Sequence, residues 1–152
     1  MTAMHLRPAR ADEADLLTEL CLRSKAVWGY DEVFMRACRA ELTLTAADFT
    51  RSSLQVAVEA DDVIGLAQVV VDGEAADLAK LFIAPSTLRG GAGRKLFEWA
   101  VSEARRHGAR WMTIEADPDA APFYRRMGAV DNGVVASGSI PGRVLPRLKL
   151  TL

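Results

Sequence analysis

The hydrophobic pattern of residues 54–83 constrains the fold most, because it has the two-residue period of β-strands. From Leu54 to Glu59, apolar side chains alternate with other residues, as in a strand with one buried face. Turn signals follow at Asp61-Asp62 and at Asp72-Gly73, and the second is a strong hairpin signal. The segment therefore predicts an antiparallel meander and not the start of a doubly wound parallel sheet. Its strands are expected at about 54–59, 63–71 and 75–83.

The flanking segments add helices and further strands around this meander. Asp12 is predicted to cap a first helix, and Thr45 a short one. A long amphipathic helix before His107-Gly108 has the spacing of a helix with one buried face. The predicted order is β-α-α-β-β-β-α-β-α-β-β. Because linkers, repeats and low-complexity tracts are missing from the sequence, we expect one α/β (α+β) domain spanning residues 1–152.

Composition excludes several functional classes. A formal net charge of -1 gives no overall field toward nucleic acid or an anionic membrane. Neither a secretory leader nor a membrane-spanning apolar run is present, so we expect a cytoplasmic protein. Cys21 and Cys38 lack metal-ligand spacing and are expected to be reduced packing residues, with no metal bound. The arginines alternate with acids and lack an aromatic stacking platform, which disfavours nucleic-acid binding. These arginines are Arg105, Arg106, Arg110, Arg125 and Arg126.

The glycine cluster Gly90-Gly91-Ala92-Gly93 lies between a predicted strand and the long helix. Glycines let successive backbone N–H groups point outward, and the start of a helix adds a positive dipole end. Arg89, Arg94 and Lys95 bring positive charge to the same opening. The segment therefore suits a diphosphate, although a plain glycine turn with solvated basic residues has the same pattern.

Two common phosphate-binding motifs fit this cluster poorly. A P-loop needs a hydroxyl residue after its lysine, and Leu96 occupies that position after Lys95. A dinucleotide fingerprint needs a third glycine, where the chain again has Leu96. Glu115 does imitate the acid that binds ribose, but only one β-α-β unit is present. Dinucleotide binding remains a lesser alternative.

Two motifs together resemble the GNAT family of N-acetyltransferases. The stretch from Leu81 through Pro85 to Gly93 resembles the family's coenzyme A-binding motif, and Ala120-Ala121-Pro122-Phe123-Tyr124 with Gly128 resembles its next signature. The element order is also similar, so the resemblance covers nearly the whole chain. It implies a mixed, mostly antiparallel sheet of about six or seven strands, with splayed central strands and about four helices.

The chain departs from the family pattern at three positions. Leu88 stands where Gln or Arg is usual, with Arg89 one place later. Side-chain binding of the pyrophosphate is therefore in doubt, whereas binding by the backbone N–H groups does not depend on this position. Asp117 replaces an Asn that many members have near the pantetheine arm, and Ala129 replaces a larger hydrophobic residue.

The resemblance implies an acyl-CoA-dependent N-acyltransferase, most simply an acetyltransferase, acting in a ternary complex without a covalent intermediate. Tyr124 is the expected general acid, although it could merely pack its short helix. Asp77 and Glu115 are the candidate general bases, and either could instead be an ordinary solvated carboxylate. The residues expected at acetyl-CoA are Leu81, Phe82, Ile83, Arg89, Gly90, Gly91, Ala92, Gly93, Arg94, Lys95, Asp117, Ala120 and Phe123.

The expected acceptor site follows from position in the same fold. Trp28, Tyr30 and Asp31 lie in the link between the first two helices, and Arg143 ends the loop before the last strand. Aromatic walls with one acid and one base suit a small zwitterion, an amine or a peptide amine. These aromatics could equally be core residues. The resemblance also suggests a homodimer, and a catalytically idle coenzyme A-binding sensor or scaffold remains the alternative function.

Overall fold

The computed structural model describes residues 3–87 and 90–152. The predictions for Leu88 and Arg89 therefore lie outside the described residues. The strands are β1 (Met4–Pro8), β2 (Ser53–Glu59), β3 (Asp62–Asp72), β4 (Ala75–Ile83), β5 (Trp111–Glu115), β6 (Val130–Ala136) and β7 (Val144–Thr151). The helices are α1 (Ala14–Ala26), α2 (Glu32–Leu42), α3 (Ala46–Arg51), α4 (Ala92–Arg106) and α5 (Ala121–Arg126). Short 3-10 turns span Ala11–Glu13 and Pro85–Thr87.

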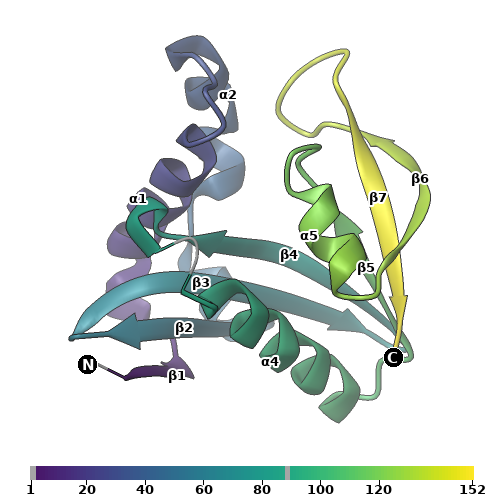
Figure 1. Cartoon of the computed structure of the whole chain (residues 1–152), viewed down its shortest axis with the longest axis horizontal. Helices are drawn as coiled ribbons and strands as arrows, with labels where there is room; N and C mark the ends of the chain where they lie inside the picture. Colours follow the sequence, from purple (N-terminus) through teal and green to yellow (C-terminus); the bar gives the residue numbers. More distant parts are fainter. Residues whose placement is uncertain (1–2, 88–89) are drawn as a thin grey trace.

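The strands form one seven-stranded sheet in the order β1-β2-β3-β4-β5-β7-β6 (Figure 1). Every neighbouring pair is antiparallel except β4 and β5, which run parallel because α4 connects them. The predicted meander is therefore confirmed as β2, β3 and β4. The mixed, mostly antiparallel sheet is confirmed too, and the described residues form five α-helices where about four were predicted.

The sheet parts at its centre, between β4 and β5. Their register covers only Ala75–Asp77 against Trp111–Thr113, although β4 continues to Ile83. The same strand carries a β-bulge, because Gln68 and Val69 of β3 face Lys80 and Leu78, which leaves Ala79 as an extra residue. A bulge bends a strand and increases its twist. The two strands therefore diverge like a fork, as the resemblance predicted.

Helices cover both faces of this sheet, with α1 and α2 behind it and α4 and α5 in front in Figure 1. Helix α4 packs closely on the meander through Leu96, which is fully buried. A Cβ atom added to Gly65 of β3 would come within 2.8 Å of Leu96 Cδ1 and 2.9 Å of Ile83 Cδ1. The absence of a side chain at Gly65 thus lets the helix approach the fork.

The helix starts differ from the predictions in one place. Asp12 does not cap α1, because a 3-10 turn over Ala11–Glu13 precedes that helix. The acid that organises this start is Glu13, whose carboxylate accepts the Arg10 backbone N–H at 2.8 Å and pairs with Arg7 at 2.8 Å. Thr45 lies at the N-cap of α3, as predicted.

Within the described ranges, no helix is both long enough and apolar enough to cross a membrane.

Leu96→Ala should lower the free energy of unfolding by about 2–5 kcal/mol, because it leaves a cavity under α4. Urea denaturation followed by circular dichroism measures this change. Val33→Ala is the matched control, since Val33 is 68% exposed on α2. The control should change stability by less than about 0.5 kcal/mol. Equal effects of the two substitutions would contradict the packing described for Leu96.

Candidate functional site

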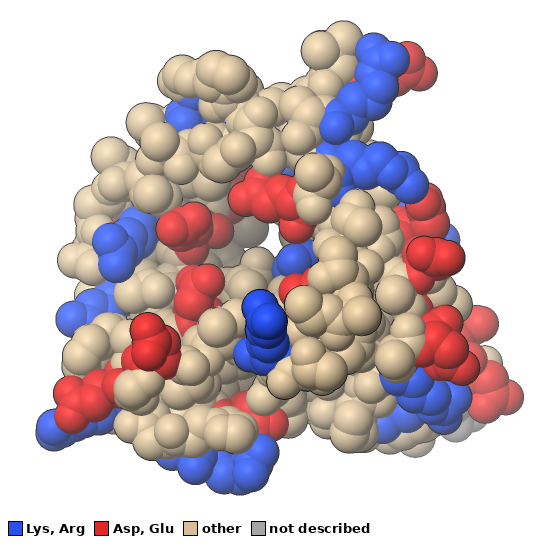
Figure 2. All heavy atoms as spheres, turned by 180° about the vertical axis from the view of Figure 1, so that it is seen from behind, with Lys and Arg blue, Asp and Glu red and all other residues tan. Residues whose placement is uncertain are grey.

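A cavity of about 570 Å³ occupies the fork between β4 and β5. This volume lies within the roughly 300–1,000 Å³ typical of small-molecule sites. Its walls come from α1, α2, β4, β5, α5, the starts of α4 and β7, and the loop between β6 and β7. Figure 2 views the face that carries α1 and α2, and shows a hollow at its centre with acidic and basic side chains around it.

Backbone polar groups of β4 face this cavity. The Ala84 N–H donates to the Ile64 carbonyl of β3 at 2.8 Å. In an antiparallel pair, every second residue of β4 bonds to β3, and the backbone N–H and C=O groups of the residues between them point away from β3. Leu81 and Ile83 are the residues between. The Ile83 N–H donates to Ser24 Oγ of α1 at 3.3 Å. Ser24 thus occupies the Ile83 N–H, and the backbone groups of Leu81 can pair with amide groups of an extended ligand.

The start of α4 lies beside the same opening. Gly91 has a φ of +83°, a left-handed conformation that favours glycine. Gly93 lines the cavity, and a Cβ atom there would lie 3.6 Å from Phe123 and 3.8 Å from Ile83. Arg94 is exposed and lies 4.0 Å from Glu98 across one helical turn. This helix start thus has an exposed positive side chain beside its glycine turn.

Tyr124 is buried in α5 and lines the cavity. Its ring packs against Phe97 and Phe123, with centroids 6.1 and 5.3 Å away. Burial raises the pKa of Tyr124 well above its ordinary value of 10, and the charge of Asp117 raises it further. The phenol therefore keeps its proton at neutral pH.

Asp77 and Glu115 both line the cavity near the base of the fork. Asp77 is opposite Thr113 in the last residue pair that joins β4 to β5, and Glu115 ends β5. Burial of its carboxyl raises the pKa of Asp77, and the neighbouring charge of Glu115 raises it further. A carboxylate with a raised pKa is better suited to accept a proton from a nucleophile.

A polar cluster joins three distant segments across the cavity; it consists of Lys25, Tyr30, Asp117 and Arg143. The Tyr30 hydroxyl donates to Asp117 Oδ2 at 2.6 Å and accepts from Arg143 Nη2 at 2.7 Å. Lys25 Nζ and Arg143 Nη2 lie 3.6 and 3.5 Å from the same Asp117 oxygen. Burial, then the bond to Asp117, raises the pKa of Tyr30 to about 12. Tyr30 is therefore neutral near pH 7.

Aromatic rings support this cluster. Tyr30 stacks on Phe34 of α2 with centroids 3.9 Å apart. Arg143 lies 5.1 and 4.8 Å from the two ring centroids, and Lys25 lies 5.6 and 5.9 Å from them. Cations at such distances are attracted to aromatic rings. The aromatic pair thus fixes both positive side chains at the edge of the cavity.

The predicted site residues fall into three groups. Those that line the cavity are Trp28, Asp77, Leu81, Phe82, Ile83, Gly93, Glu115, Asp117, Ala120, Phe123, Tyr124 and Arg143. Those at the start of α4 or in the polar cluster, without lining the cavity, are Gly90, Gly91, Ala92, Arg94, Lys95 and Tyr30. Asp31 instead caps α2 by accepting the Phe34 N–H at 2.8 Å.

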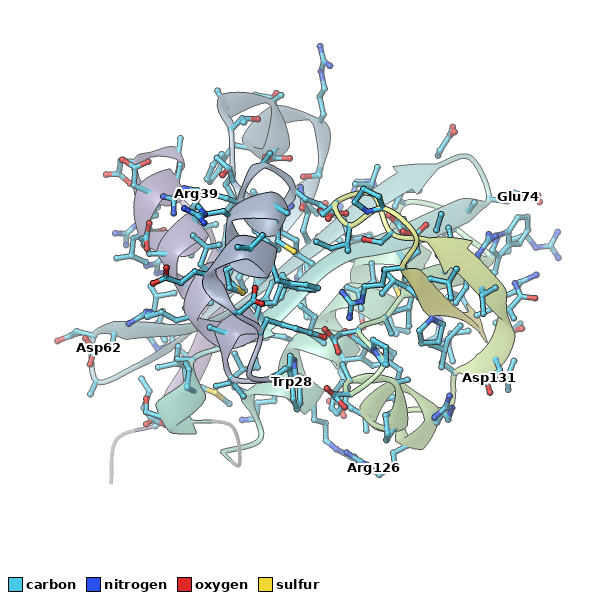
Figure 3. The ribbon with its side chains drawn as sticks, turned by 90° about the horizontal axis from the view of Figure 1, so that it is seen from above. Trp28, Arg39, Asp62, Glu74, Arg126 and Asp131 are labelled. Carbon is cyan, nitrogen blue, oxygen red and sulfur yellow. The ribbon has the colours of Figure 1, made fainter. Side chains whose placement is uncertain are left out.

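Trp28 lies in the α1–α2 link, on the side that faces α5 (Figure 3). Ser24, Lys25 and Phe34 contribute to the cavity or its polar cluster without having been predicted. Ser24 and Lys25 lie in the last turns of α1, where a polar face is ordinary, and Phe34 follows the periodicity of α2. None of them carries a local signal of function.

Comparison with known proteins agrees with this geometry. Residues 21–135 match the family described as the acetyltransferase (GNAT) domain. No curated protein matches the sequence closely enough to stand as a relative. Solved structures do match at low sequence identity, and these show the fold alone.

One similar structure is a GCN5-related N-acetyltransferase from Rhodopseudomonas palustris, with 21% identity, a TM-score of 0.81, and coverage of 100% of this chain and 98% of that chain. Another is the PaiA N-acetyltransferase of Thermoplasma acidophilum, solved with coenzyme A, with 14% identity, a TM-score of 0.80 and 99% coverage of both chains. A third is YncA of Salmonella typhimurium, solved with acetyl-CoA, with 21% identity, a TM-score of 0.71, and coverage of 98% and 94%.

The divided sheet and the glycine turn at the start of α4 are consistent with the family match over residues 21–135. The chain belongs to the GNAT family of acetyltransferases.

Proposed function

We propose that this protein transfers the acetyl group of acetyl-CoA to a primary amine, by direct attack within a ternary complex. The observation that carries the proposal is the fork between β4 and β5. It opens a cavity that is lined by the edge of β4 facing away from β3 and by the side chain of Tyr124. A slot with amide-pairing groups on one wall and a protonated phenol on another suits an extended thioester.

The residues present fit the donor. In this proposal the pantetheine arm lies along β4, where the backbone of Leu81 pairs with its amides, and the Ile83 N–H leaves Ser24 Oγ to join them. The pyrophosphate lies at the start of α4, where Gly91 and Gly93 leave the backbone N–H groups accessible and the helix dipole attracts an anion. Binding energy from these remote contacts orients the thioester carbonyl for attack.

Proton transfers complete the reaction. The amine attacks only as the neutral base, so its proton passes to Asp77, directly or through one water. The amine nitrogen then bonds to the thioester carbon, and the carbon–sulfur bond breaks. Tyr124 donates its proton to the departing thiolate of coenzyme A, and the proton that the acylated nitrogen loses as it becomes an amide restores the phenol of Tyr124. The raised pKa of Asp77 supports its role as the proton acceptor, and Glu115 is the second candidate for this role.

The first experiment measures donor binding and turnover together. Acetyl-CoA and coenzyme A should raise the unfolding temperature, whereas NADH and ATP should not. Thiol release with a panel of amines should then reveal turnover. Tyr124→Phe should lower kcat by roughly 100-fold or more, because it removes the general acid. The variant should still be stabilised by acetyl-CoA.

Other outcomes of this experiment contradict the proposal in different ways. Stabilisation by acetyl-CoA without thiol release from any amine would favour a coenzyme A-binding scaffold. Stabilisation by NADH alone would favour the dinucleotide alternative. An unchanged kcat in Tyr124→Phe would show that Tyr124 is not the general acid.

The role of Asp77 predicts a pH dependence. The ratio of wild-type kcat to that of Asp77→Asn should be near one in acid, where Asp77 is protonated, and should grow as pH rises through its raised pKa. At the plateau it should reach roughly 100-fold. Steady-state kinetics from about pH 4, near the ordinary pKa of an aspartate, to about pH 9 measure this ratio.

Two controls separate catalysis from folding. Because the pKa of Asp77 is raised in the folded protein, its ionised form costs stability as pH rises. Asp77→Asn should therefore unfold at the same or a higher temperature at neutral pH. Glu115→Gln is the matched control, and a pH-dependent loss confined to it would assign the base to Glu115 instead.

A further inference from the structure

The polar cluster carries more positive than negative charge. Lys25 and Arg143 contribute two cations, Asp117 contributes one anion, and Tyr30 is neutral because its pKa is about 12. The three charged side chains are only 15%, 19% and 10% exposed. Burying charge is costly unless it is paired. One positive charge at this edge of the cavity therefore lacks a partner within the cluster.

Other acids line the cavity but do not neutralise this charge by contact. They are Glu41, Asp77, Glu115 and Asp119. Among the described residues, the only carboxylate within 4.0 Å of Lys25 Nζ or of the Arg143 guanidinium is that of Asp117. Glu41 is instead hydrogen-bonded to Ser139 in the β6–β7 loop.

The two cations also have unused hydrogen-bond donors. Arg143 donates from Nη2 to Tyr30, and the described residues accept from no other nitrogen of its guanidinium. Lys25 Nζ lies 3.6 Å from Asp117 and has no closer acceptor in the described part of the chain. In the described part of the chain, every fully buried side-chain nitrogen has a hydrogen-bond partner. The unused donors of Lys25 and Arg143 are therefore accessible, and both residues line the cavity.

We propose that the acceptor is a small amino acid-like molecule, whose carboxylate binds Lys25 and Arg143 while its amine points toward Asp77. The inference rests on the proposed function. A carboxylate supplies the missing negative charge and accepts the unused N–H groups, and such charge-assisted bonds are strong. The stacked rings of Tyr30 and Phe34 hold the two cations in place for it. Asp77 and Glu115 bear the opposite charge, and attract the ammonium group.

The experiment compares matched acceptors. Each of a panel of amino acids is assayed beside its methyl ester and its decarboxylated amine, by thiol release from acetyl-CoA. For the best amino acid, kcat/KM should exceed that of both neutralised analogues by roughly 10- to 100-fold, as expected for charged hydrogen bonds. Arg143→Gln and Lys25→Gln should each move this ratio toward one, mainly through KM, and Arg143→Lys should keep part of it.

A matched variant controls for loss of positive charge elsewhere. Arg39 lies on α2, and Figure 3 shows it on the side of that helix away from β7. It pairs with Glu19 at the surface, where both side chains are 58% exposed. Arg39→Gln should keep the wild-type preference for the carboxylate. Thermal unfolding with acetyl-CoA establishes that each variant is folded.

A binding measurement separates failure of this inference from failure of the proposed function. Thermal shifts are recorded with each amino acid and its ester in the presence of coenzyme A. A carboxylate-specific shift that Arg143→Gln abolishes supports the inference, even without turnover. Turnover in which esters and amines equal the amino acids overturns it while leaving the acyltransferase intact. Loss of acetyl-CoA affinity in Arg143→Gln also overturns it, because Arg143 then binds acetyl-CoA and not the acceptor.

Discussion

The geometry of this protein depends on how few residue pairs join β4 to β5. Two parallel strands would normally bond along their whole shared length, which leaves no space between them. Here the pairing stops after Asp77, the bulge at Ala79 bends β4, and the remaining backbone edge has no strand beside it. Unpaired backbone groups at the middle of a sheet are costly unless a ligand or water satisfies them. The missing strand pairs at the fork leave the cavity and, apart from the bond between the Ile83 N–H and Ser24 Oγ, a backbone edge that a ligand can pair with.

The rest of the molecule compensates for this opening. On one side the meander and α4 form a dense layer, because Gly65 allows Leu96 to approach closely. On the other side β5, β7 and β6 form a second group of paired strands. The two groups are linked at the base of the fork by three residue pairs and across its mouth by the bonds of Tyr30, Asp117 and Arg143.

Local patterns in the sequence predicted the parts of the fold that depend on local physics. Alternation gave the meander, glycines marked the start of α4, and the Phe-Tyr pair marked α5. The cap of α1 was assigned to Asp12 in error, because a 3-10 turn shifts that helix start and sequence cannot distinguish neighbouring acids. The fork itself was expected only through the family resemblance. The polar cluster could not be predicted, because Lys25 resembles any basic residue in the last turn of a helix. Only the folded chain brings it to Asp117.

The bonds of the polar cluster span long stretches of chain. Tyr30 is separated by 87 residues from Asp117 and by 113 residues from Arg143. Contacts between such distant positions close large loops, whose entropy is lost before the bonds are gained, and such contacts slow folding. During synthesis Tyr30 cannot meet Arg143 until nearly the whole domain has left the ribosome. The meander can pair long before that time. The wall assigned to the acceptor is thus completed late, and incompletely folded chains lack it.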